Sequence, residues 1–383
     1  MSPASCRTER LASLDAARGT ALLFSLISHF GSAYFRTPAS QKWASLLVDI
    51  GMVATPTFVV VSGLLLGFLF QTSRDWSETR TRLIDRGLFL LVVGHWLIAV
   101  AFFPSQHLTA MSFSTDAIGA ALIAGPLLIP HITPRNRLLF AVSAYALSWL
   151  VTLIWFPGAL AANFVEEVTV GNLTHTFFRG GSFPVLPWLS VYLASSVYGE
   201  RFARLHKEGR LGRAAFELGT AGALMVATAI AIKIVEIAAW RSPQTALVAE
   251  RLHALFRIGQ KYPPGPGYIL FYGGIALCVL TAAVSWELRR WPRALLDLGA
   301  VWGEASLAIF VIHHYALWFC LYYLTPSSLT AAPVFFAALV VLMTWFGLAW
   351  RRWRGNRFIT VGLDAFAETS RKRWRTLTGA SVG

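Results

Sequence analysis

The chain has 383 residues, of which 56% are hydrophobic and only 14% are charged, and its mean hydropathy is +0.57. A soluble globular protein would carry about 25% charged residues. The composition therefore excludes a disordered chain, a coiled coil and an ordinary soluble enzyme. It predicts an all-α polytopic integral membrane protein.

The net charge of +14 arises from 33 Lys and Arg residues against 19 Asp and Glu residues. The basic residues are spread over many short loops, and no nucleic-acid-binding motif is visible, so we expect a lipid bilayer and no nucleic acid as the partner. The three cysteines do not have the spacing of a disulfide framework or of a metal site, and we expect no metal.

A membrane-spanning helix needs about 20 mostly apolar residues. On this criterion the sequence predicts about ten transmembrane helices. They cover residues 14–35, 46–70, 87–104, 114–132, 138–156, 183–199, 214–239, 267–286, 297–324 and 331–350.

The basic residues test this topology. With the N-terminus inside, 24 of the 33 Lys and Arg residues fall in inner segments and 7 in outer segments. This asymmetry predicts that both termini are cytoplasmic. We expect a transmembrane domain at 1–350 and a basic cytoplasmic tail at 351–383. Residues 246–258, in an outer loop, have the pattern of a short helix on the membrane surface.

The first span carries two ionisable residues, Arg18 and His29, which are eleven residues apart. At 100° per residue both side chains lie on one helix face, about 16 Å apart along the axis, and Ser25 lies on the same face. Asp15 precedes Arg18 by three residues and can pair with it. One interpretation is a functional stripe; the other is a headgroup anchor and a packing histidine.

The ninth span contains Glu304, His313 and His314. If the helix is continuous from Asp297, His313 lies about 24 Å along it, at a depth similar to that of His29. Two histidines that meet at one depth can form an acid/base site. The alternative is a structural hydrogen bond between helices, which is favoured more strongly for His314.

Three other patterns have simpler explanations. Gly63 and Gly67 have the four-residue spacing of close helix packing. Lys233 and Glu236, three residues apart in the seventh span, can neutralise each other. Arg82 and Arg86, with Arg80, precede the third span, where they could bind phosphate groups, although inner-loop charge bias explains them equally well.

Several of these stretches resemble the transmembrane acyltransferase superfamily. The resemblance is to the acyltransferase-3 family, with features of the heparan-α-glucosaminide N-acetyltransferase-like branch. It rests on residues 10–19 (RLASLDAARG), the Arg18–His29 spacing, and residues 56–63 (PTFVVVSG), 183–188 (FPVLPW) and 306–313 (SLAIFVIH).

The resemblance implies transfer of an acyl group, commonly acetyl from cytosolic acetyl-CoA, to a hydroxyl or amine of an outer-face glycan or glycolipid. It implies that His29 and Arg18 are the essential pair and that His313 supports them. Arg82 and Arg86 are candidate contacts for the coenzyme A phosphates, and Ser25 lies beside the expected path of the donor. The family implies a bacterial inner membrane, while the oligomeric state stays open.

We expect His29 to act as a general base on the acceptor, with an acyl-histidine intermediate as the less favoured variant. A different class of function fits the same polar residues. In a transporter or flippase for a lipid-linked sugar or small solute, the intramembrane His, Glu and Lys side chains would be relay or substrate contacts.

Overall fold

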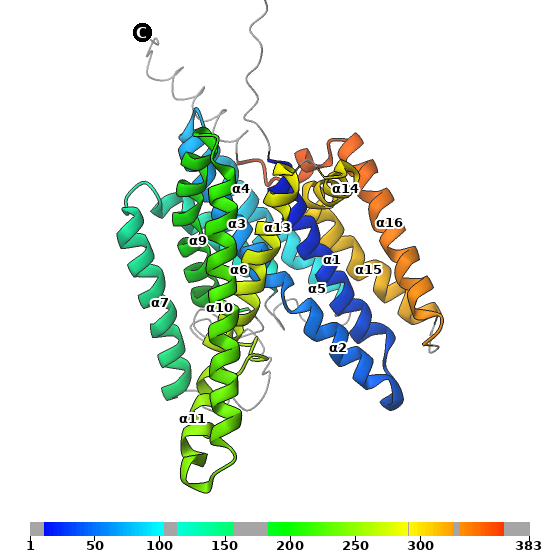
Figure 1. The fold of residues 1–383 in the computed structure, drawn as a ribbon. Coiled ribbons are helices and arrows are strands. Elements are labelled where there is room, and N and C mark those ends of the chain that lie inside the picture. Colours follow the sequence, from blue (N-terminus) through cyan, green and yellow to red (C-terminus); the bar gives the residue numbers. More distant parts are fainter. Residues whose placement is uncertain (1–10, 103–112, 156–182, 290, 325–328, 364–383) are drawn as a thin grey trace, which may run out of the picture.

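The structure, a computed structural model, describes residues 11–102, 113–155, 183–289, 291–324 and 329–363 (Figure 1). Within these ranges the chain is all-α and has no strand, which confirms the predicted fold class. Residues 157–182, between two of the predicted spans, and the end of the predicted tail lie outside the described residues. The helices are α1 (Ala12–Tyr34), α2 (Gln41–Gly51), α3 (Ala54–Thr72), α4 (Trp76–Phe89), α5 (His95–Phe102), α6 (Ser114–Leu128), α7 (Pro134–Trp155), α9 (Val185–Lys207), α10 (Leu211–Ala239), α11 (Ala246–Phe256), α12 (Pro266–Tyr268), α13 (Gly274–Leu288), α14 (Arg293–Glu304), α15 (Ser306–Leu324) and α16 (Ala332–Arg352).

Six helical stretches among the described residues are long and apolar enough to cross a membrane, and the bent pair α14 and α15 raises the number to seven. Three other helices, α1, α6 and α9, correspond to predicted spans but are not among these. Helix α6 has only 15 residues, while α1 and α9 bury polar side chains among other helices. The count of ten spans stays a prediction.

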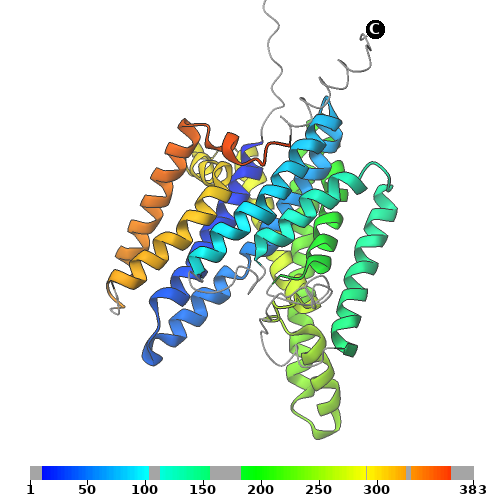
Figure 2. The same ribbon diagram turned by 180° about the vertical axis from the view of Figure 1, so that it is seen from behind.

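The helices form one bundle, in which α1 begins and α16 ends on the same side (Figures 1 and 2). Helix α14 lies on this side, which we call the α14 side. Helices α10 and α16 expose apolar side chains such as Phe216, Leu224, Val334 and Trp345. An apolar outer surface of this kind is expected where helices face lipid.

Helices α3 and α9 pack so closely that their backbones touch. A Cβ atom on Gly63 would lie 2.2 Å from the carbonyl oxygen of Tyr192, and one on Gly67 would lie 2.0 Å from that of Ser196. Small residues permit this approach between membrane helices. The structure thus confirms the prediction that the glycine spacing in this segment serves helix packing.

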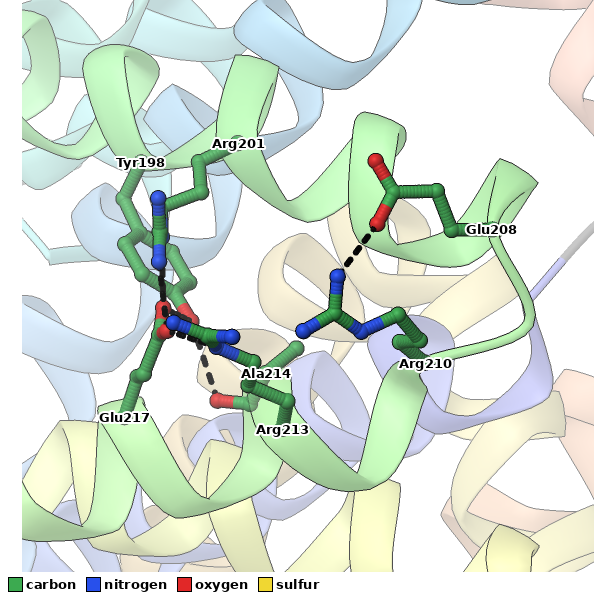
Figure 3. Close-up of polar contacts among 7 residues, drawn as sticks. All are labelled: Tyr198, Arg201, Glu208, Arg210, Arg213, Ala214 and Glu217. Atoms are coloured by element: carbon green, nitrogen blue, oxygen red, sulfur yellow. Dashed lines mark hydrogen bonds and ion pairs between the residues drawn. The ribbon is translucent and has the colours of Figure 1, made fainter.

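The turn between α9 and α10 is held by a carboxylate that accepts from two arginines (Figure 3). Arg201 binds both oxygens of Glu217 at 2.6 Å, and Arg213 Nε donates to Oε1 at 3.0 Å. The Tyr198 hydroxyl donates to the Ala214 carbonyl at 2.9 Å. The charges of Arg201 and Arg213 are therefore partly neutralised within the fold.

The predicted short surface helix forms as α11, which packs against the end of α10. Buried Glu236 accepts hydrogen bonds from Lys233 at 2.7 Å and from His253 Nδ1, on α11, at 2.9 Å. The predicted pairing of Lys233 with Glu236 is confirmed, and the pair also ties α11 to α10.

The predicted ninth span is not one straight helix. It divides at Ala305 into α14 and α15, whose axes differ by 81°. Helix α14 crosses α1 so closely that a Cβ on Gly303 would lie 1.8 Å from the carbonyl oxygen of Asp15. The count of about 24 Å from Asp297 along one helix is therefore wrong, because α14 does not share the direction of α15, although His313 does lie beside His29 as predicted. Glu304 ends α14 and pairs with Arg351 at 3.3 Å, rather than lying deeper along one helix.

Because the α1–α14 crossing leaves no space for a side chain at Gly303, we predict that Gly303→Ala destabilises the protein by about 1–3 kcal/mol, as overpacking commonly does. Thermal unfolding in detergent measures the change. Gly212→Ala is the control, since no described atom lies within 4 Å of its Cβ position and a helical alanine is favourable. Equal unfolding temperatures for the wild-type protein and Gly303→Ala would contradict the described crossing.

Candidate active site

Arg18 lies in the second turn of α1, where α14 ends and α15 begins. Its Nη2 donates to the Ser306 hydroxyl at 2.8 Å, and its Nη1 lies 3.8 Å from Asp15 Oδ1, as the sequence predicted for this pair. The side chain keeps 30% of its surface exposed. The guanidinium is therefore held by protein on one side and accessible on another.

Arg18 lines a cavity of about 500 Å³ enclosed by α1, α3, α4, α6 and α15. The lining of α3 runs from Phe58 to Leu69, which corresponds to about 16 Å of helix. Charged and amide groups reach the cavity from α1, α4, α14 and the segment after α16, while most of its wall is apolar. The charged or amide side chains in the lining are Asp15, Arg18, Arg86, Glu304 and Asn356.

Phe310 connects this cavity to the histidines. Its side chain lines the cavity, and its ring centroid lies 5.3 Å from that of His313 and 5.0 Å from that of His314. Phe58, which also lines the cavity, faces Phe310 edge-on at 6.4 Å. The histidines thus lie directly behind the aromatic wall of the cavity.

Three imidazoles meet between α1 and α15. The His29 ring centroid lies 5.3 Å from that of His313 and 4.7 Å from that of His314, and the latter two lie 3.9 Å apart. His313 and His314 are buried, whereas His29 is partly exposed. The structure therefore brings together the two histidines that the sequence singled out and adds a third.

The tautomers of two of these rings follow from their partners. His313 Nδ1 lies 3.0 Å from the carbonyl oxygen of Ile309, and His314 Nδ1 lies 2.6 Å from that of Phe310. A carbonyl oxygen only accepts, so both Nδ1 atoms carry the proton. In the neutral rings the lone pair is then on Nε2, where it can accept a proton or bind a ligand.

The candidate donor-binding residues separate into two groups. Arg18 and Arg86 line the cavity, while Arg82 and Ser25 are not among its lining residues. Arg82 is 60% exposed and pairs with Glu78 one turn earlier on α4. Ser25 is buried within the helix packing around α1. Neither position faces the space in which Arg18 lies.

The segment after α16 forms part of the cavity wall. We call residues 355–363 the C-terminal strap. Asn356 and Ile359 line the cavity, and Asn356 Nδ2 donates to the Glu304 carbonyl at 2.9 Å. Buried Asp85 on α4 accepts from the backbone N–H groups of Val361 at 3.2 Å and Leu363 at 2.8 Å. Residues assigned by sequence to a cytoplasmic tail therefore form part of the cavity wall.

Three features of this region could not be predicted from the local sequence pattern. His314 adjoins His313, and a helix places successive residues 100° apart, so their convergence on His29 was not expected. Asp85 and the strap are joined only by the fold. The Nδ1 atom of His95, on α5, lies 2.9 Å from Asp116 Oδ2 on α6, and this oxygen also accepts from the Phe113 N–H at 2.7 Å.

We predict that Asp85→Ala releases the strap, because it removes a charged acceptor shared by two backbone N–H groups. Hydrogen bonds to charged groups contribute about 1.5–3 kcal/mol, so the amides of Val361 and Leu363 should exchange at least about tenfold faster with deuterium. Hydrogen-exchange mass spectrometry measures this. Asp75→Ala is the control, since Asp75 only caps the start of α4 in the described contacts. Unchanged exchange in Asp85→Ala would contradict the anchoring role.

Comparison with known proteins identifies the family. No curated protein matches the chain. The family model described as acyltransferase domain matches residues 11–351, which is more than half of the chain and includes Arg18, His29 and both histidines of α15. The match ends before the strap. The resemblance to the acyltransferase-3 family is confirmed, while the heparan-type branch stays a prediction. The chain belongs to the acyltransferase-3 family.

Proposed function

We propose that this protein is a membrane acyltransferase that moves an acyl group, typically acetyl, from acyl-CoA to a hydroxyl or amine of an outer-face glycan or glycolipid. The observation that carries the proposal is the cavity, which extends from Arg18 and Arg86 to Phe310, with three imidazoles directly behind Phe310. In this proposal the chain crosses a bacterial inner membrane ten times, both termini are cytoplasmic, and the α14 side faces the cytosol.

The cavity suits a coenzyme A thioester because its polar and apolar parts match those of the molecule. The anionic nucleotide would lie near Arg18 and Arg86, since guanidinium groups bind phosphate well. The thin pantetheine arm would follow the apolar wall along α3. Arg18 and His29 are separated by about 16 Å of helix rise, a distance that an extended arm can cover.

His29 would act as the general base. Its imidazole nitrogen takes the proton of the acceptor hydroxyl while the acceptor oxygen attacks the thioester carbonyl. The C–S bond then breaks, and the proton passes to the departing thiolate to give coenzyme A. Partial exposure of His29 supports this choice over His313 and His314, which are buried. The reaction written in this way uses no metal, and an acyl-histidine intermediate is the variant that we favour less.

The transporter alternative relied on intramembrane charges as relay groups. Two of these, Lys233 and Glu236, pair with each other and do not line the cavity. A binding experiment separates the two functions. Acetyl-CoA should raise the unfolding temperature of the purified transferase, and with an acceptor it should release free thiol. A transporter should show neither effect and should instead give substrate-dependent flux in vesicles.

We predict that His29→Ala reduces acyl transfer by about 100- to 10,000-fold, the range for loss of a general base. Thiol release from acetyl-CoA in the presence of envelope glycans measures the rate, and size-exclusion chromatography checks folding. The control is His131→Ala, which removes an exposed imidazole between α6 and α7. Wild-type transfer by a folded His29→Ala protein would reject the site.

We predict that Arg18→Gln raises the KM for acetyl-CoA at least about tenfold, because it removes a charged donor from the nucleotide end of the cavity. Arg82→Gln is the matched control. It removes an arginine from the neighbouring α4 surface but does not alter the cavity lining. An unchanged KM in Arg18→Gln, or an equal rise in Arg82→Gln, would contradict the assigned position of the donor.

A further inference from the structure

The three imidazoles between α1 and α15 have a feature that acid/base chemistry alone does not require. Each of His29, His313 and His314 offers one ring nitrogen, and these three atoms all lie within 4.8 Å of one another. They come from two helices and include two consecutive residues. Three imidazoles gathered in this way can each direct one nitrogen toward a single cation.

The hydrogen bonds made by the Nδ1 atoms of His313 and His314 are also typical of a metal site. His313 and His314 each donate Nδ1–H to the backbone carbonyl four residues earlier. Metal-binding histidines characteristically make this second contact, which fixes the ring and leaves the other nitrogen for the ion. His313 Nε2 is buried and has no hydrogen-bond partner among the described residues. Its lone pair is therefore available within the cluster.

We propose that His29, His313 and His314 form a binding site for a divalent transition-metal ion of the zinc class. Zinc binds neutral imidazoles at about 2.0–2.1 Å, and three histidines with an open fourth position are a recurrent zinc arrangement. Tetrahedral geometry at that bond length places the nitrogens about 3.3 Å apart. Because the nitrogens lie within 4.8 Å of one another, metal binding requires them to approach by at most about 1.5 Å. Of the three residues, His29 is the one that is not fully buried, so an ion would enter from its side.

The bound ion would change what the site can do. A nitrogen that coordinates zinc has committed its lone pair and cannot also accept a proton. Zinc and the acceptor hydroxyl therefore compete for His29, and the ion is a reversible inhibitor of acyl transfer. This inhibitory role rests on the proposed function, whereas the metal site itself does not.

The test uses full-length protein without a histidine tag, stripped with a chelator and then titrated with Zn²⁺. Isothermal titration calorimetry should give one high-affinity ion per chain. X-ray absorption should show three nitrogen ligands at about 2.0–2.1 Å. His313→Ala should weaken binding by about 100-fold or more, since even outer-shell partners contribute 10- to 100-fold. The control His131→Ala should bind as the wild type does.

Two results would overturn the site. One is the absence of a stoichiometric ion in the wild-type protein. The other is a wild-type affinity in both His313→Ala and His314→Ala, with the folding of each checked by circular dichroism. X-ray absorption of the wild-type protein decides the matter if both variants fail to fold. The outcomes are separable from those for acyl transfer. Zinc binding together with full transfer by His29→Ala would refute the proposed base and keep the metal site.

Discussion

The crossing of α14 over the start of α1 is the interaction on which the site depends. Gly303 brings the α14 backbone against the Asp15 carbonyl, and the chain then turns by 81°. Arg18 binds the Ser306 hydroxyl at the first residue of α15. The turn directs α15 along α1, so that His313 reaches His29 about two turns after Ser306. A straight ninth span would carry these residues in a different direction, and the three imidazoles would not meet.

The same crossing explains why a cationic side chain is tolerated here. A charged group inside a membrane protein is expensive unless it has partners or reaches water. Arg18 has both, because Asp15 and Ser306 contact it and the cavity exposes part of its surface. Asp15 offsets the charge at 3.8 Å, a distance that leaves the guanidinium able to bind a further anion. The cavity therefore holds a guanidinium whose charge is stabilised by protein groups without a ligand.

The sequence predicted the parts of the site that depend on a single regular helix. Arg18 and His29 are related by helix periodicity, and α1 is unbroken between them. Prediction from the sequence failed where tertiary packing overrides that periodicity. The count from Asp297 to His313 assumed a continuous ninth span, which the structure divides at Ala305. The contact at Gly303 depends on a helix nearly 300 residues away. Asp85 and Val361 are likewise brought together only by the fold, so local pattern could not reveal the strap.

Some predicted spans, such as α1, are not among the helices that are long and apolar enough to cross a membrane. The reason is again tertiary packing. Helices that face lipid must be apolar around much of their surface. Helices α10 and α16 are of this kind, since only 17% and 22% of their most apolar 18-residue stretches are buried. Helix α1 packs against α2, α3, α13, α14 and α15, so its environment is protein rather than lipid. It buries Ser13, Asp15 and Ser25 among these neighbours. Interior placement removes the requirement for an apolar sequence, and this freedom allows α1 to carry both Arg18 and His29. A helix that does not qualify as a membrane span by length and composition is thus the one able to hold the proposed chemistry.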